Sequence, residues 1–170
     1  MRYFTPAWHR GDLTDEEFEA VPERYAIAVA TMCETAPEAI AKLVAGPSLH
    51  DALVISASVD RRRRQVTLRL RAGDLQRGYF DREMVYDGVR IEHLDTDTFA
   101  RIARDPSSEL LYDEVDREVL GPWTHRLLFW PDYRELELVF DAIRFSDRPQ
   151  GDRTVPLAKD RYSESVTPAV

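Results

Sequence analysis

The chain has 170 residues, of which 44% are hydrophobic and 32% charged, and its formal net charge is −8. This composition is typical of a globular protein and excludes a disordered chain. The acidic balance disfavours general binding to nucleic acid or to an anionic membrane. No apolar run approaches the roughly 18 residues that span a membrane, and the N-terminus lacks the apolar core of a signal peptide, so we expect a cytoplasmic protein.

Residues 14–46 carry helical periodicity, and their capping signals divide them into two helices. Thr14 and Glu17 fit a capping box at the start of the first helix. Pro22 lies inside the apolar pattern, where we expect it to kink the helix or to separate a first turn. The single cysteine, Cys33, falls on the apolar side of this helix and is interpreted as a buried thiol without chemical function.

The second helix should begin near Thr35 and Glu38, which repeat the spacing of a capping box. Gly46 and Pro47 then end it, because glycine favours the position after a helix and proline cannot continue one.

After Pro47 the apolar period changes from 3.6 to 2, which predicts strands. The expected strands are 52–59, 65–71, 79–86, 89–94, 109–119, 123–130 and 135–146. Asp87-Gly88 predicts a two-residue hairpin between two of them, since such turns need positive φ. Residues 109–119 also fit a helix, but two clear strands follow closely and favour a strand. The apolar parity switches within the last strand, which predicts a bulge near Asp141.

These elements predict an α+β fold in which two N-terminal helices pack on a mainly antiparallel sheet of about six to seven strands. One short helix is inserted at 97–104, capped by Asp95 or Thr96. We expect a single domain over 1–146, with 14–46 as its helical part and 49–146 as its sheet part. Residues 147–170 are polar and aperiodic, which predicts a loose tail or a strap over the surface.

Four polar residues at strand positions are the candidates for catalysis: His50, Asp51, His93 and His125. If they converge at one end of the sheet, imidazoles and a carboxylate could bind a divalent metal or perform acid–base chemistry. Alternatively, each is a singly hydrogen-bonded residue of the core or rim, and His50-Asp51 marks only the junction between helix and strand. No pair has the His spacing of a metal motif, so neither a metal nor a cofactor is predicted.

Other chemical motifs are weaker. Asp95 and Asp97 could ligate a cation, but a helix cap explains them more simply. The chain has no nucleophile elbow, Walker loop or dinucleotide-binding glycine motif.

The run Arg61, Arg62, Arg63 and Arg64 is the most concentrated charge in the chain. It could form a basic patch for an acidic partner, or only a solvated hairpin tip. The segments 12–19 and 105–118 are acidic, and this segregation of charge suits a match within the molecule or with another protein better than binding to nucleic acid. Aromatic residues for base stacking do not surround the arginines.

The opening MRYFTPAWHRG resembles the Met-Lys/Arg-Tyr-Phe-Thr start of a bacterial family of uncharacterised proteins. The segment SLHDA at the start of the first strand, with HRLLFW and ELELVF, is similar to the sheet region of that family. The resemblance covers most of residues 1–146 and implies the same fold, but no activity.

The sequence therefore favours a non-enzymatic cytoplasmic module that binds another protein, immunity-like or regulatory, with a homodimer as a further option. One alternative is a metal-assisted or acid–base enzyme centred on His50 and Asp51. Another is a small-ligand binder that uses the sheet face and the aromatic N-terminus.

Overall fold

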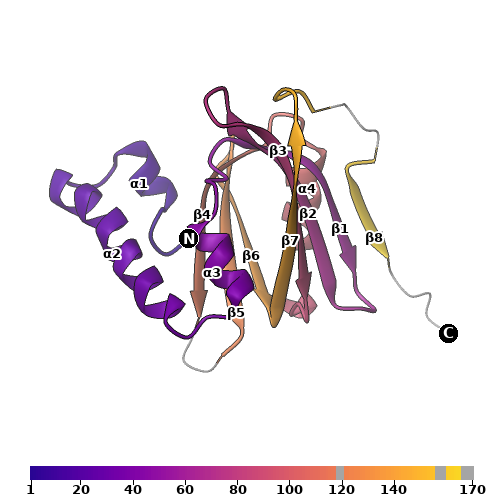
Figure 1. The fold of residues 1–170 in the computed structure, drawn as a ribbon, viewed down its shortest axis with the longest axis horizontal. Coiled ribbons are helices and arrows are strands. Elements are labelled where there is room, and N and C mark those ends of the chain that lie inside the picture. The colour runs from indigo at the N-terminus through magenta and orange to yellow at the C-terminus, as the bar shows by residue number, and fades with distance from the viewer. Residues whose placement is uncertain (118–120, 156–159, 166–170) are drawn as a thin grey trace.

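The computed structural model describes residues 1–117, 121–155 and 160–165. In this part of the chain the helices are α1 (Pro6–Arg10), α2 (Asp15–Cys33), α3 (Glu38–Ala45) and α4 (Thr96–Arg104), with a 3₁₀ turn at Ile91–His93. The strands are β1 (Ala52–Asp60), β2 (Gln65–Asp74), β3 (Gly78–Asp87), β4 (Glu109–Arg117), β5 (Trp123–Trp130), β6 (Arg134–Phe140), β7 (Ala142–Gln150) and β8 (Tyr162–Ser165). The predicted α+β class and mainly antiparallel sheet are confirmed (Figure 1).

The sheet curls on itself. Its strand order is β6-β5-β4-β1-β2-β3-β7, so β6 and β7 lie at opposite ends of the path, although only Asp141 separates them in the chain. The joint between β1 and β4 is short, with two paired positions, Ala52 with Leu110 and Leu53 with Glu109. Beyond that joint β1 pairs with β8 instead, in parallel. The interior of the curled sheet holds a continuous hydrophobic core.

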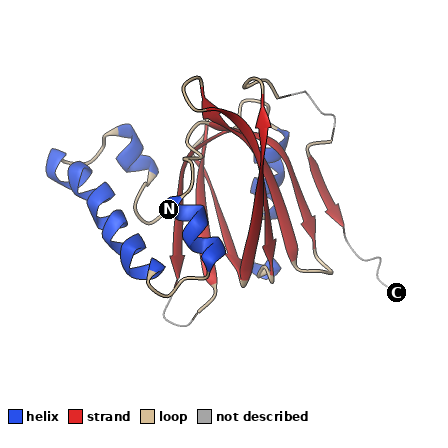
Figure 2. Ribbon diagram, in the orientation of Figure 1, coloured by secondary structure: helices blue, strands red, loops and turns tan. Residues whose placement is uncertain are grey.

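Two helices complete this core from different sides (Figure 2). Helix α4 packs against β1 and β6 and buries Phe99 and Ile102 completely. Helix α3 packs against β7 and buries Ile40 and Leu43. Both helices therefore cover parts of the sheet where strands are not paired with each other.

Helices α1 and α2 form an arm (Pro6–Cys33) that stands beside the sheet in Figure 1. Glu114 fastens the chain before this arm to β4. Its buried carboxylate accepts the backbone N–H groups of Arg2, Tyr3 and Phe4 at 2.8, 2.7 and 2.6 Å. Three donors converging on one carboxylate make strong, charge-assisted bonds.

Helix α2 runs through Pro22 without being split, in contrast to one of the two expected outcomes. A proline has no N–H to donate, so the carbonyl of Phe18, four residues earlier, loses its helical partner. The Trp8 indole N–H donates to that carbonyl at 3.0 Å, and the Trp8 ring stacks on Phe18. Trp8, on α1, therefore supplies the hydrogen bond that Pro22 removes, and it ties α1 to α2.

The hairpin predicted at Asp87-Gly88 is wrong. Gly88 does have positive φ, 67°, but the following residues form a 3₁₀ turn rather than a strand. The Val89 N–H donates to Arg64 and the Arg90 N–H to Val139, which directs the chain toward β6. The open side of β3 pairs with β7, so tertiary pairing overrides the local turn signal.

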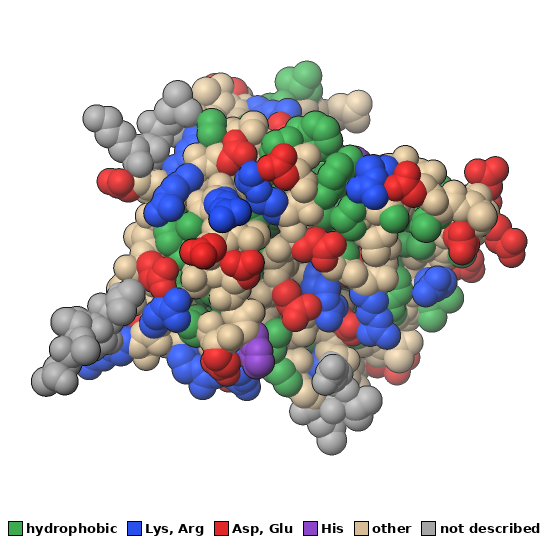
Figure 3. Space-filling view, turned by 180° about the vertical axis from the view of Figure 1, so that it is seen from behind, with side chains coloured by type: hydrophobic (Ala, Val, Ile, Leu, Met, Phe, Trp, Pro, Cys, Tyr) green, Lys and Arg blue, Asp and Glu red, His purple; other side chains and the backbone are tan. Residues whose placement is uncertain are grey.

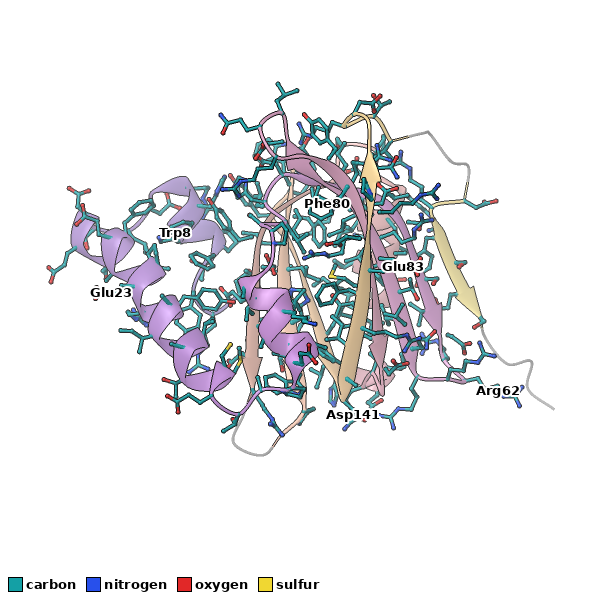
Figure 4. The ribbon with its side chains drawn as sticks, viewed as in Figure 1. Trp8, Glu23, Arg62, Phe80, Glu83 and Asp141 are labelled. Carbon is teal, nitrogen blue, oxygen red and sulfur yellow. The ribbon has the colours of Figure 1, made fainter. Side chains whose placement is uncertain are left out.

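The single strand predicted at 135–146 is two strands. The parity switch is real, but it marks a corner at Asp141 rather than a bulge, because β6 ends at Phe140 and β7 begins at Ala142 on the other edge of the sheet. Asp141 donates its N–H to the Asp87 carbonyl at 3.0 Å. Figure 4 labels this residue at the end of the molecule where the two edge strands meet.

Two further expectations need correction. Helix α3 is capped by Pro37 without a side-chain bond, so Thr35 does not form the predicted capping box. The folded part does not end at 146, because β7 continues to Gln150 and β8 joins the sheet beside β1. Residues 156–159 and 166–170 of the predicted tail lie outside the described residues.

Candidate functional site

A groove of about 700 Å³ lies beside the junction between α3 and β1. Its lining comes from three separate parts of the chain: the junction (Pro47, Ser48, His50, Asp51), the β2–β3 hairpin (Gly73–Phe80) and Arg153. We call it the hairpin groove. Its volume lies within the range of roughly 300–1,000 Å³ that is usual for small-ligand sites.

His50 and Asp51 form a pair at the wall of this groove. The His50 Nδ1 lies 3.0 Å from the Asp51 Oδ1, and both side chains are partly exposed. This contact places Nδ1 of the imidazole beside the carboxylate and leaves Nε2 away from it. A carboxylate that orients a histidine in this way is a usual part of acid–base sites.

The backbone of Asp51 is held in an unusual conformation, with a φ of 61°. Its N–H donates to Leu110 at 2.8 Å, and its carbonyl accepts from the Arg153 guanidinium at 2.8 Å. Aspartate tolerates this left-handed region better than most residues, but the conformation still occurs mostly where the surroundings enforce it. The bonds on both sides of the residue therefore hold the pair in place.

Tyr112 supports the pair from β4. Its ring centroid lies 5.0 Å from that of His50 and 5.7 Å from that of His9, on α1. Burial, and then the negative charge of Asp51, raise the pKa of the Tyr112 hydroxyl. Ser48 also lines the groove, but its hydroxyl oxygen accepts the backbone N–H of His50 at 3.1 Å.

The other two candidate histidines lie elsewhere, so the four candidates do not converge at one end of the sheet. His93 lines a second groove of about 460 Å³ together with Arg90, Glu92, Pro122, Thr124, Arg126, Glu137 and Val139. The two grooves lie near opposite ends of β3, a ten-residue strand of about 30 Å. The alternation of apolar residues predicts a strand at 89–94, but this segment contains a 3₁₀ turn that includes His93.

His125 is completely buried inside the curled sheet. Its Nδ1 lies 2.8 Å from the Tyr86 hydroxyl and its Nε2 lies 3.1 Å from the Asp113 carboxylate. Burial, and then the charge of Asp113, raise the pKa of Tyr86 well above its ordinary value. Tyr86 and His125 stand on strands that are not neighbours in the sheet, so this chain of polar contacts ties the two sides of the fold together.

The four arginines at the β1–β2 tip are largely engaged. Arg61 pairs with Glu164, the Arg63 guanidinium lies 3.8 Å from Asp60, and Arg64 donates to the Val89 carbonyl at 3.2 Å. Among the described residues, Arg62 is the one of these four side chains with neither an ion pair nor a hydrogen bond. The other weak candidate is explained as a cap, because Asp95 accepts the Thr98 N–H at 2.9 Å at the start of α4, with Asp97 in its first turn.

A metal site has no geometric basis in the described ranges, where no three His, Cys, Asp or Glu side chains are grouped to hold an ion. The groove also contains residues that the sequence did not place in a site with His50, namely Arg77, Tyr79, Phe80 and Arg153. The only signal for Arg77 was its place between two strands. Nothing local indicates that Arg153 returns to the first strand.

None of the protein-family models compared with the sequence matches it, and a search of curated protein sequences gives no significant match. The resemblance of the N-terminus and of SLHDA to a bacterial family stays a prediction. None of the described helices is long and apolar enough to cross a membrane.

Proposed function

We propose that this chain is a non-enzymatic cytoplasmic module, immunity-like or regulatory, and that it binds a basic protein through the arm. The observation that carries the proposal is the poor burial of α2. This 19-residue helix buries only Val21, whereas Ile27 is 61% exposed. A helix that contributes so little to the core is available for an external contact.

The exposed side of α2 has an apolar centre and a mainly acidic rim. Ala26, Ile27 and Ala30 are exposed and lie together at helical spacing. Glu19, Glu23 and Glu34 flank them and are also exposed, with Arg24 as the one nearby cation. Acidic side chains gather at the end of the molecule where the arm lies (Figure 3). This rim repels a second copy of itself, so charge complementarity favours a basic partner over a homodimer through this surface.

Glu23 and Glu83 provide a matched pair of substitutions, because both are exposed and lie on different parts of the molecule (Figure 4). Glu23→Lys changes the rim of the arm, whereas Glu83→Lys makes the same charge change on β3. We expect a basic protein to bind the wild-type chain in a cell extract at low salt and to be lost with Glu23→Lys or Ile27→Arg, but retained with Glu83→Lys. A partner retained by both arm variants, or lost equally with all three, would contradict the proposal.

An acid–base enzyme is the second candidate, and the 3.0 Å contact between His50 and Asp51 is what favours it. Such an enzyme would hydrolyse or isomerise a substrate with His50 Nε2 as the base and Asp51 as the orienting group. Turnover of a panel of activated esters and phosphate esters should then fall at least about a hundredfold with His50→Ala. Equal background rates for the wild type and the variant would remove this candidate.

A further inference from the structure

The charged groups of the hairpin groove differ in how many hydrogen-bond and ion-pair partners the protein gives them, and this difference indicates the chemistry of a ligand. Its two carboxylates are already engaged. Asp74 accepts the backbone N–H groups of Gln76 and Arg77 at 2.7 and 2.8 Å, and these bonds lower the pKa of Asp74. The Asp51 Oδ1 lies 3.0 Å from the His50 Nδ1. The Oδ1 atom of each carboxylate is therefore engaged by the protein itself.

Donors in the groove also remain for a ligand. The Arg77 guanidinium lines the groove and has no ion-pair partner in the ranges that the structure describes. His50 keeps its Nε2, because only Nδ1 contacts Asp51. Arg153 uses Nη2 for the Asp51 carbonyl and lies 3.2 Å from Glu109, which leaves its other N–H groups. A ligand that complements these groups must bring acceptors, and a negative charge strengthens each bond.

Beside Ser48 and Gln76, the lining includes an apolar and aromatic part. Pro47, Tyr79 and Phe80 contribute flat surfaces, and Leu75, at the hairpin tip, is 91% exposed. An apolar body beside such rings gains from loss of water-accessible area. The groove therefore offers an apolar surface next to a group of cationic donors.

The hairpin that presents Arg77 has a fixed shape. Gly73 has a φ of 103°, and a Cβ at this position would lie 2.1 Å from the Gly78 carbonyl oxygen. Asp74 closes the loop by accepting two of its backbone N–H groups. A loop held in this way presents Arg77 with little loss of conformational freedom on binding.

We propose that the hairpin groove binds a small organic anion, a carboxylate or phosphate carried on a flat apolar body. Arg77 and Arg153 face the charge, His50 donates or accepts at its edge, and Tyr79 and Phe80 contact the body. This site is separate from the arm and does not depend on its partner. The groove beside His50-Asp51 is thus a binding site for a ligand of defined chemical class.

The test uses the full chain and four probes: phenyl phosphate, benzoate, inorganic phosphate and benzylamine. In two-dimensional amide NMR spectra we expect phenyl phosphate or benzoate to shift the signals of Gly73, Gly78 and His50 with saturable binding. The relative affinities of these two probes show whether the groove prefers a phosphate or a carboxylate. Inorganic phosphate should bind more weakly than phenyl phosphate because it lacks the apolar body, and benzylamine should not saturate the site.

Arg77→Ala should weaken binding of the better probe about tenfold, since it removes a charge-assisted contact. Arg62→Ala is the matched control, because Arg62 also sits exposed at a hairpin tip without an ion-pair partner in the described residues, and it should leave binding unchanged. Unaltered amide dispersion shows that each variant is folded. Equal binding of benzylamine and benzoate, equal effects of the two variants, shifts remote from the groove, or no saturable shift by either aromatic anion would overturn the proposal.

Discussion

Helices α2 and α4 begin with equally clear caps and end in opposite environments. Thr14 and Glu17 form a complete capping box on α2, and Asp95 caps α4 through the Thr98 N–H. Yet α4 buries four of its nine residues, Phe99, Ala100, Ile102 and Ala103, whereas α2 buries only Val21 of nineteen. Local signals decide where a helix starts, and the sheet decides whether the helix belongs to the core or to the surface.

Helix α4 stabilises the fold, whereas helix α2 is available for an external contact. Helix α4 packs against β1, β6 and β8, so its removal would open the interior. Helix α2 packs against β4 and α3 and is tied to α1 by Trp8, and the N-terminal residues held by Glu114 attach its arm to the sheet. We therefore expect substitutions in α4 to change global unfolding and substitutions in α2 to change local opening or partner binding.

The largest expected effect is at Phe99, which is completely buried in α4. Phe99→Ala should lower the free energy of unfolding by about 3–5 kcal/mol, because it removes buried area and leaves a cavity. Urea denaturation measures this loss. If that variant does not fold, Phe99→Leu should still show a smaller loss of the same sign. A change below about 0.5 kcal/mol, the size expected for a surface substitution such as Ile27→Ala, would contradict the assignment of α4 to the core.

Glu114 tests the attachment between the two regions. Glu114→Gln keeps the shape but weakens the bonds to the N–H groups of Arg2, Tyr3 and Phe4, so we expect a loss of about 1–3 kcal/mol. Hydrogen exchange of these three amides should accelerate. Glu137→Gln is the control, because that side chain is 53% exposed and its loss should cost little. Unchanged amide exchange in the Glu114 variant would show that the carboxylate does not hold the N-terminus.

Asp95 tests the cap of α4 and its dependence on pH. Asp95→Ala should cost about 1 kcal/mol in global unfolding at neutral pH. The bonds from Thr98 lower the pKa of Asp95 below its ordinary value of 3.8, so its charge-dependent contribution is present above that pH. The contribution is lost as the pH falls through the lower folded pKa. Asp95→Asn keeps a capping oxygen but has no charge to lose, so its free energy of unfolding should fall less steeply at acidic pH. The same dependence on acidic pH as in the wild type would contradict the role of Asp95 as a charged cap.

The smallest global effect should come from the equivalent change in the arm. Thr14→Ala removes the side-chain oxygen that accepts the Glu17 N–H, as Asp95→Ala does in α4. Because α2 contributes so little to the core, we expect global unfolding to change by less than about 0.5 kcal/mol. Amide exchange near the start of α2 should nevertheless rise. A global loss equal to that of Asp95→Ala would mean that the arm unfolds together with the sheet.

Much of the fold could be predicted from periodicity and end signals. The ambiguous segment 109–119 contains the strand Glu109–Arg117, and the short helix Thr96–Arg104 is capped by Asp95, one of the two expected caps. The errors share one cause, which is that pairing partners are not encoded locally. Asp87-Gly88 looked like a hairpin, but β3 pairs with β7, and Asp141 looked like a bulge, but it is a corner between the two edges.

The candidate site was only partly predictable. His50 and Asp51 do form a pair and do line a groove, because they are adjacent at a junction that the sequence identifies. His93 and His125 do not join them, since face parity along a strand says nothing about which end of a curled sheet a residue occupies. Arg77 and Arg153 reach the groove from a turn and from the C-terminal segment, and neither carries a local signal.

The sequence by itself determined the class of fold, the caps at Thr14 and Asp95 and the junction at SLHDA, because capping, periodicity and turn residues act over a few positions. Only the tertiary structure decided that the sheet curls, that β7 and β8 join it, and that His50 and Arg77 line one groove while His125 meets Tyr86 inside. These outcomes depend on contacts between segments far apart in the chain, whose energies appear only when the core is packed.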